Sequence, residues 1–207
     1  MGYVMSGVTI GERAPSFRLP SGQGPKIGPE DYRERSNLII WFTKGMVCPF
    51  CRQQMAQLVR GYPQFQALDT EILEVTPAPL QRARIYAQKF RIPFPYLSDA
   101  DCRVRRLYGV ERRSRSLGEY VNAFVQGARM PKPPEEFENP PSVFSDLPNL
   151  LADDDTGFFI LDKDGVVQYA LAGSYASSAG PRSIPSNEEI VRELQRCEQV
   201  ESRAPQQ

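Results

Sequence analysis

The stretch Asn37–Cys51, NLIIWFTKGMVCPFC, decides the fold of this chain. Its first half, residues 37–43, is an apolar run with few polar breaks, which is typical of a central strand buried on both faces. The residues that follow recur at the spacing of a helix packed on a sheet, and they are Cys51, Met55, Leu58, Val59 and Tyr62. Pro49 fits the first turn of this helix, and Gly61 is its expected end. The pattern therefore predicts that Cys48 lies at a helix N-terminus directly after a buried strand.

The next elements repeat this arrangement. A second strand is expected at residues 71–76 and a second helix at 80–90. Such a strand-helix-strand unit implies parallel pairing and a right-handed crossover. The prolines within 93–97 break the pattern, and Ser98 or Asp99 is expected to cap a short third helix.

The C-terminal part follows a different pattern. Two strands, 158–161 and 166–171, flank the turn sequence DKDG and predict a β-hairpin. Ser186 and Glu189 then form the capping box of a last helix. The predicted order, β-α-β-α followed by β-β-α, is an α/β fold with a central mixed sheet flanked by helices.

A chain of 207 residues is expected to form a single domain, here 1–207. Prolines interrupt the pattern within 111–155, which we interpret as a Pro-rich insertion before the late hairpin. Residues 202–207 are expected to form a disordered tail.

The composition excludes several classes of function. The chain has no histidine, which excludes Ser-His-Asp hydrolysis, Cys-His nucleophile pairs and His-ligated metal sites. Its 25 basic and 25 acidic residues balance, so we expect neither nucleic acid nor a membrane as a partner. Because there is no long apolar run and no signal-peptide pattern at the start, a cytoplasmic protein is expected.

The motif CPFC, Cys48 to Cys51, predicts redox chemistry. Two cysteines three residues apart at a helix start can exchange between dithiol and disulfide. The helix N-terminus stabilises the thiolate of Cys48, which is therefore the predicted nucleophile, and Cys51 is the predicted resolving thiol. Since no imidazole is available, a cation such as Arg52 or Lys44 is expected to assist. The only cofactor expected is the redox-active disulfide Cys48–Cys51 itself.

The alternative for this motif is half of a four-cysteine zinc site. Cys102 and Cys197 would have to complete it, and neither belongs to a second C-x-x-C pair. Cys197 lies on the apolar face of the last helix and is most simply a small buried residue.

Several segments resemble the AhpC/TSA family, the peroxiredoxin-like branch of the thioredoxin superfamily. They are GERAPSFRL at 11–19, MVCP at 46–49, IPFPYLSD at 92–99 with YGV at 108–110, and FILDKDG at 159–165. The resemblance implies a thioredoxin-like α/β fold with an N-terminal extension. It also implies that peroxide chemistry takes place at the cysteine of the second segment.

This sequence departs from the family at the peroxide site. Peroxiredoxins use P-x-x-x-T-x-x-C, whereas Trp41 and Gly45 stand where the proline and threonine belong. A later arginine that polarises the peroxide in many members aligns with Thr156, at a position that faces the dithiol. Thr43 is the candidate substitute for orienting the substrate, and Arg52 is the candidate thiolate stabiliser.

We therefore expect a thiol-based antioxidant oxidoreductase, in first place a thiol-dependent peroxidase. A thioredoxin-like protein-disulfide oxidoreductase is the alternative, and a zinc-bound or redox-sensing interaction module is the third hypothesis. The expected partners are a peroxide or disulfide substrate and a thiol reductant such as a thioredoxin-type protein. The resemblance also allows a homodimer.

Overall fold

A five-stranded mixed β-sheet forms the centre of the computed structural model, which describes residues 7–110, 125, 132–140, 156–173, 176–177, 180–181 and 184–201. The strand order is β5-β4-β3-β6-β7. The strands are β3 (Asn37–Phe42), β4 (Thr70–Thr76), β5 (Tyr96–Ser98), β6 (Thr156–Leu161) and β7 (Val167–Gly173). β3, β4 and β5 are parallel, whereas β6 is antiparallel to β3 and β7 is antiparallel to β6. The predicted mixed sheet is thus confirmed.

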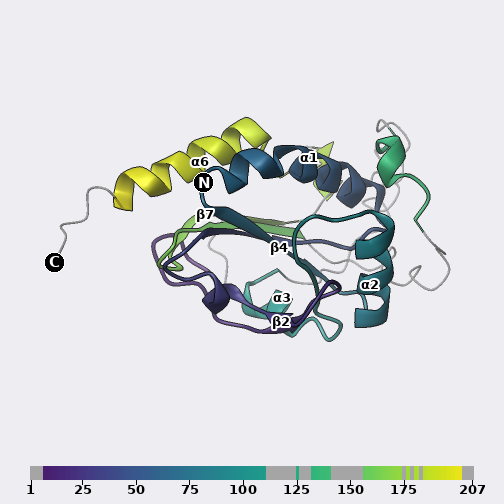
Figure 1. Cartoon of the computed structure of the whole chain (residues 1–207), viewed down its shortest axis with the longest axis horizontal. Coiled ribbons are helices and arrows are strands. Elements are labelled where there is room, and N and C mark those ends of the chain that lie inside the picture. The colour runs from purple at the N-terminus through teal and green to yellow at the C-terminus, as the bar shows by residue number, and fades with distance from the viewer. Residues whose placement is uncertain are drawn as a thin grey trace.

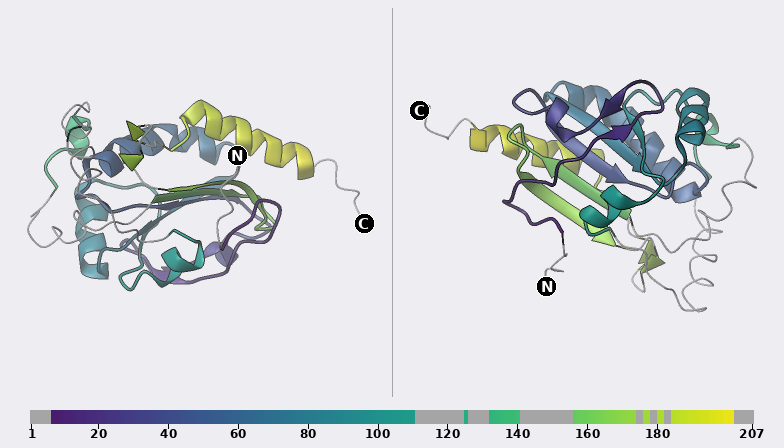
Figure 2. Two further views of the ribbon diagram at one scale, coloured as in Figure 1. Left: turned by 180° about the vertical axis from the view of Figure 1, so that it is seen from behind. Right: turned by 90° about the horizontal axis from the view of Figure 1, so that it is seen from below.

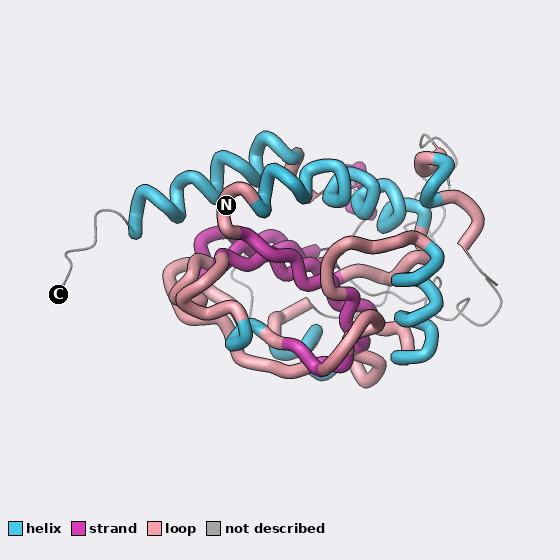
Figure 3. The backbone as a smooth tube through the Cα atoms, viewed as in Figure 1, coloured by secondary structure: helices cyan, strands magenta, loops and turns pink. Residues whose placement is uncertain are grey.

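Helices cover the two faces of the sheet unequally. α1 (Pro49–Gln66) and α6 (Asn187–Glu201) lie side by side on one face, and α2 (Leu80–Lys89) packs against β5 (Figure 1). The opposite face is covered by α3 (Arg103–Leu107) and by loops from the N-terminal part of the chain (Figure 3). None of the described helices combines the length and the apolar character needed to cross a lipid bilayer.

Side chains on the two faces of the sheet form two separate cores. Because side chains alternate along a strand, Ile39 and Trp41 face α1, whereas Ile40 and Phe42 face the α3 side. All four side chains are fully buried. β3 is therefore enclosed on both faces, as its uninterrupted apolar run predicts.

The remaining elements are short. β1 (Leu19–Pro20) and β2 (Lys26–Ile27) pair antiparallel and precede the 3-10 turn η1 (Pro29–Asp31) (Figure 2). A second 3-10 turn, η2 (Glu135–Phe137), contacts α1. β8 (Ala176–Ser177) pairs with β9 (Gly180–Pro181).

The predicted cap of the last helix is confirmed, whereas at α3 the N-cap residue is Cys102 and Asp99 bonds the first turn from three residues further back. The Asp99 carboxylate accepts hydrogen bonds from the backbone N–H groups of Val104 (3.2 Å) and Arg105 (2.9 Å) at the start of α3. At α6, the N–H of Ser186 donates to the Glu189 carboxylate (2.8 Å), and the N–H of Glu189 donates back to the Ser186 hydroxyl (3.2 Å). These reciprocal bonds form the expected capping box.

Two expectations were wrong. α1 does not end at Gly61 but continues to Gln66, through Pro63. The proline-rich segment after α2 also leads into a strand, β5, rather than only interrupting the pattern. The predicted insertion 111–155 is described only at residues 125 and 132–140, and the predicted tail 202–207 lies outside the described residues.

Candidate active site

Cys48 lies between the end of β3 and the start of α1. The loop 43–47 follows the strand, Cys48 itself caps the helix with an extended backbone, and Pro49 occupies the first helical position. The N–H of Cys48 donates to the Gly45 carbonyl (3.1 Å), and its own carbonyl accepts from the N–H of Arg52 (3.1 Å). The predicted position at a helix N-terminus is confirmed.

The two cysteines of the motif form one buried pair. Cys48 exposes 4% of its surface and Cys51 none, and both thiols are reduced. The Cys51 side chain hydrogen-bonds to Cys48, and this bond is the largest influence on the pKa of Cys48. The hydrogen bond lowers this pKa and burial raises it. Backbone N–H groups of the first helical turn and the Lys44 charge lower it further. Together they lower the Cys48 pKa to about 7, which favours the reactive thiolate.

Arg52 lies close to the pair, but its hydrogen bonds go to the preceding loop. Its Nη1 donates to the carbonyls of Met46 (2.8 Å) and Val47 (3.1 Å). Burial lowers the pKa of Arg52, and the negative charges of Cys48 and Cys51 raise it in compensation. The guanidinium therefore interacts with the thiolate charge while it holds the loop in shape.

Thr43 is fully buried, and its hydroxyl makes two internal hydrogen bonds. The hydroxyl accepts from the N–H of Gly45 (2.9 Å) and donates to the Glu74 carboxyl (3.1 Å). Its carbonyl accepts a bond from the Arg105 guanidinium, which lies over the Phe42 ring. Both bonds of the Thr43 hydroxyl are thus made within the protein. Its predicted role in orienting the substrate stays a prediction.

The structure explains why glycine stands at position 45. Gly45 has φ of +88°, a backbone conformation that side chains rarely adopt. A Cβ atom at this position would lie 2.8 Å from the Thr76 hydroxyl and 3.7 Å from the Tyr96 hydroxyl. The family's threonine therefore does not fit into this loop.

Thr156 is placed beside the same end of the sheet. It is the first residue of β6, next to Gly157, which pairs with Phe42 at the end of β3. Because side chains alternate along the strand, Thr156 shares the α1 face with Phe158. It is buried, and its predicted position facing the dithiol stays a prediction.

Two residues of this region were missed by sequence reasoning. Glu74 and Tyr96 are fully buried on β4 and β5, and they pair in register. The only signal for Glu74 was a charged residue inside a strand expected to be buried. The register that brings Tyr96 next to it cannot be derived from local periodicity.

The other cysteines do not join the pair. Cys102 precedes α3 on the far face of the sheet, whereas Cys197 is buried on α6 with its thiol directed to the Glu193 carbonyl (3.3 Å). Among the residues that the structure describes, no group of three His, Cys, Asp or Glu side chains is arranged to hold a metal ion.

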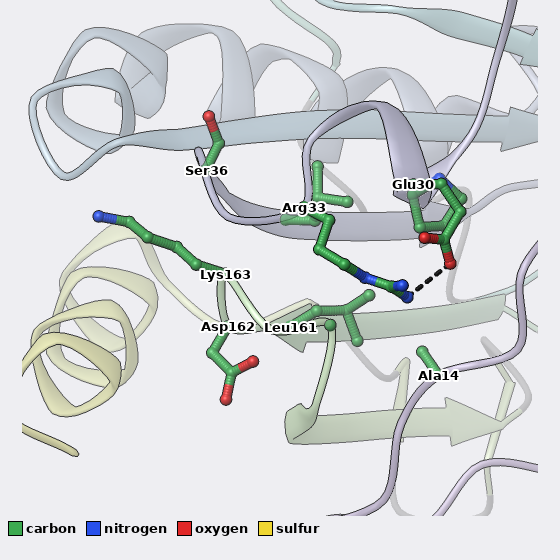
Figure 4. A pocket seen from close by; sticks show the side chains of 10 residues that line it. Ala14, Glu30, Arg33, Ser36, Leu161, Asp162 and Lys163 are labelled. Carbon is green, nitrogen blue, oxygen red and sulfur yellow. Dashed lines mark hydrogen bonds and ion pairs between the residues drawn. The ribbon is translucent and has the colours of Figure 1, made fainter. Parts of the chain in front are cut away.

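Two pockets lie away from the dithiol. The one in Figure 4 is near the opposite end of β3, has about 10 Å³ of free volume and contains the Arg33–Glu30 ion pair (2.5 Å). It has room for about one water molecule. A groove of about 350 Å³ follows β7 and α6, and its lining is Tyr169, Leu171, Ile184, Pro185, Glu189, Arg192, Glu193 and Arg196. Neither pocket is lined by Cys48 or Cys51.

Comparisons with known proteins found a matching family and several similar proteins. A model of the AhpC/TSA family matches residues 10–170. A putative peroxiredoxin of Mycobacterium tuberculosis is 24% identical over 119 residues, which cover 58% of this chain and 75% of that protein. Chloroplastic peroxiredoxin Q of Triticum aestivum is 23% identical over 168 residues, covering 81% of this chain and 61% of that protein.

Solved structures show the same fold. PrxQ of Xylella fastidiosa superimposes with a TM-score of 0.64 at 13% identity, covering 92% of this chain and 98% of that one. Peroxidoxin BcpB of Mycobacterium tuberculosis gives a TM-score of 0.61 at 16% identity, covering 91% and 97%. The α/β thioredoxin-like architecture expected from the sequence is therefore confirmed.

Proposed function

The chain belongs to the AhpC/TSA family and is a peroxiredoxin-like oxidoreductase; we propose that Cys48 is its peroxide-reducing nucleophile and Cys51 its resolving thiol. The observation that carries the proposal is the buried Cys48–Cys51 pair at the start of α1, in which the Cys51 hydrogen bond lowers the Cys48 pKa to about 7. A thiolate is the reactive form of cysteine toward peroxides and disulfides.

The proposed cycle has three balanced steps. The Cys48 thiolate attacks the O–O bond of a peroxide ROOH, and with one proton this gives the sulfenic acid Cys48–SOH and ROH. The Cys51 thiol then displaces the hydroxyl group, forming the Cys48–Cys51 disulfide and water. A dithiol reductant, such as a thioredoxin-type protein, finally reduces the disulfide and becomes oxidised itself.

A disulfide oxidoreductase is the second candidate, and a specific observation favours it. The positions that would orient a peroxide hold Gly45, where the backbone leaves no space for a threonine, and Thr156. A C-x-x-C dithiol needs neither residue to exchange with a protein disulfide. In that case the Cys48 thiolate would attack a substrate disulfide and expel one substrate thiolate, and Cys51 would then attack the mixed disulfide, forming Cys48–Cys51 and releasing the second substrate thiol.

Stopped-flow oxidation of the reduced protein distinguishes the two functions. We expect hydrogen peroxide or an organic hydroperoxide to oxidise Cys48 at least about 100 times faster than an ordinary thiol of the same pKa. A protein disulfide is the competing substrate. Cys48→Ser should abolish the fast phase, whereas the matched variants Cys102→Ser and Cys197→Ser should leave it intact.

Each outcome of this experiment decides a claim. Peroxide oxidation at the rate of a free thiol would reject the peroxidase function, and a fast reaction with the protein disulfide would then support the second candidate. A fast phase that survives Cys48→Ser would reject the assignment of the nucleophile. The cytoplasmic location, the identity of the reductant and a homodimer stay predictions.

A further inference from the structure

One arginine of α3 is directed into the interior of the protein. Three of the five residues of this helix are arginines, and they are Arg103, Arg105 and Arg106. Arg103 and Arg106 are exposed, whereas Arg105 exposes only 1% of its surface. A guanidinium group is seldom buried to this extent, because its charge loses its hydration, unless the protein supplies contacts in its place. The contacts of Arg105 therefore indicate what it does.

The Arg105 side chain reaches the loop that leads to the nucleophile. Its guanidinium lies over the Phe42 ring, 5.9 Å from the ring centroid, and its Nη2 donates a hydrogen bond to the Thr43 carbonyl. The backbone of Arg105 is held as well, since its N–H donates to the Asp99 carboxylate (2.9 Å). α3 and α1 lie on opposite faces of the sheet (Figure 1). Arg105 thus connects the face covered by α3 with the loop between β3 and Cys48.

The bond from Arg105 fixes the backbone on one side of Lys44. A peptide unit is planar, so a hydrogen bond to the Thr43 carbonyl also sets the direction of the Lys44 N–H. On the other side of Lys44, the N–H of Gly45 donates to the Thr43 hydroxyl (2.9 Å). Both peptide units that flank the Lys44 Cα atom are therefore held in place, and Lys44 itself is buried.

The same loop continues directly to the nucleophile. The Gly45 carbonyl accepts a hydrogen bond from the N–H of Cys48 (3.1 Å), which ties the two ends of the loop together. The charge of Lys44 is one of the influences that lower the pKa of Cys48. In a buried environment such an influence depends strongly on the distance between the two charges, because water and salt screen it little. The position of Lys44 therefore affects the stability of the thiolate.

Titratable groups from several elements surround the dithiol. They come from the loop, α1, α2, β5 and the segment 132–140, and they are Lys44, Cys51, Arg52, Tyr86, Tyr96 and Glu138. Arg52 bonds the carbonyls of Met46 and Val47, in the second half of the loop. Arg105 holds the first half, which contains Lys44.

We propose that Arg105 is a positioning residue for the nucleophile: by holding the Thr43 carbonyl, it places Lys44 where its charge stabilises the Cys48 thiolate. This proposal rests on the assignment of Cys48 in the proposed function. Arg105 acts through the loop and Lys44 rather than by touching the peroxide. A helix on the far face of the sheet thereby contributes to the activation of the cysteine.

The test follows the alkylation of Cys48 by iodoacetamide, a neutral reagent, as a function of pH in the reduced protein. Mass spectrometry identifies the modified peptide, and the midpoint of the pH profile reports the pKa of Cys48. Arg105→Met removes the donor but keeps most of the side-chain volume over Phe42, and it should raise the midpoint by about 0.5 pH units. The control is Arg106→Met on the same helix, whose exposed guanidinium bonds the Asp101 carbonyl (3.0 Å), and it should leave the midpoint unchanged.

A double-mutant cycle shows whether Arg105 acts through Lys44. We expect Arg105→Met to shift the midpoint in the wild-type background, but by less than about 0.1 pH units in the Lys44→Met background, where there is no charge left to position. If the charge of Arg105 acted on the thiolate directly, the two shifts would add. An equal shift in both backgrounds would therefore overturn the proposal, and so would a folded Arg105→Met protein with the wild-type midpoint.

Amide exchange of the wild-type protein is a second test, which needs no variant to fold. The N–H of Gly45 should exchange at least about 100-fold more slowly than in an unfolded chain, because its bond to Thr43 belongs to a loop that is held in place. Exchange of this amide at the unfolded rate would also overturn the proposal. Failure of the proposed peroxidase would be seen separately, as slow peroxide oxidation of a protein whose alkylation profile still depends on Arg105 and Lys44.

Discussion

Lys44 and Arg52 are both cations near Cys48, but they affect it in different ways. The Lys44 charge is among the influences that lower the Cys48 pKa. Arg52 instead bonds the carbonyls of Met46 and Val47, so its removal would disturb the loop as well as the charge. A change in thiolate stability after mutation of Arg52 therefore has two causes, the lost charge and the disturbed loop.

Lys44→Met is expected to raise the Cys48 pKa above its value of about 7, because it removes a positive charge and keeps most of the side-chain volume. The measurement is the ultraviolet absorbance of the thiolate as a function of pH. At neutral pH the variant should carry less thiolate than the wild type and react proportionally more slowly with an alkylating reagent. The matched control is Lys26→Met on β2, and an unchanged titration of the Lys44 variant would reject this lysine as the stabilising cation.

At the scale of elements, Gly61 shows how a helix contact overrides a local signal. The glycine indicates a helix end, yet α1 continues because α6 approaches it at this point. A Cβ atom on Gly61 would lie 2.6 Å from the Asn187 amide nitrogen and 2.6 Å from the Phe65 ring. Asn187 is held by a bond to the Gln57 carbonyl (2.9 Å), and Phe65 is fully buried, so neither can yield easily. The glycine is required by packing rather than by backbone conformation.

Gly61→Ala should therefore destabilise the protein by about 2 kcal/mol, as overpacking does, although alanine normally stabilises a helix relative to glycine. Urea unfolding measures the effect. Gly24→Ala is the control, because a Cβ atom there meets nothing within 4 Å, and it should change the free energy of unfolding by less than about 0.5 kcal/mol. Gly61→Ala as stable as the wild type would show that α1 and α6 do not pack this closely.

One aromatic side chain of the predicted insertion, in the segment 132–140, is buried in the core of the domain. Phe137 is buried and stacks on Phe90 with a centroid distance of 5.5 Å, in the core beneath α1. Next to it, Glu136 forms an ion pair with Arg60 at 3.7 Å in which both side chains are more than half exposed. Burial of an aromatic ring contributes far more than an exposed ion pair.

Phe137→Ala should accordingly lower the free energy of unfolding by about 3 kcal/mol, whereas Glu136→Ala should lower it by less than about 0.5 kcal/mol. Limited proteolysis provides a second measurement, since the segment should become accessible to protease only in the Phe137 variant. Equal effects of the two substitutions would contradict the anchoring role of the ring.

At the scale of the whole molecule, local sequence patterns predicted most of the fold. The strand before Cys48, the capping box of α6 and the late hairpin depend on residues close in sequence, and each was found where expected. Long-range contacts decided the rest. The neighbours of Gly61, the register of Glu74 with Tyr96 and the internal bonds of Thr43 join segments that are tens of residues apart. The dithiol could thus be located from the sequence, but the buried groups that support it could not.

The stability of the whole molecule should depend on pH in a way that follows from the missing histidine. Between about pH 6 and pH 9 no imidazole titrates, so thiols are the main side chains that change charge there, and folding lowers the pKa of one of them, Cys48. The pKa of Cys48 is lower in the folded protein than in the unfolded chain. Its contribution to the free energy of unfolding is therefore complete above about pH 8.5 and is lost as the pH falls through about 7. Glu74 changes the stability in the opposite direction. Folding raises its pKa, so its contribution to the free energy of unfolding is lost as the pH rises through the raised pKa.

We expect urea unfolding of the reduced protein to separate these two contributions. The stability of the wild type relative to Cys48→Ala should increase by about 2 kcal/mol from pH 6 to pH 9, because the wild type gains the stabilised thiolate. Relative to Glu74→Gln, the wild type should become less stable as the pH rises above the ordinary pKa of glutamate, because the unfolded chain ionises a carboxyl group that burial keeps protonated in the folded protein. A difference between wild type and Cys48→Ala that is independent of pH would show that the thiolate is not stabilised in the folded protein, and the activation of Cys48 would then need another source.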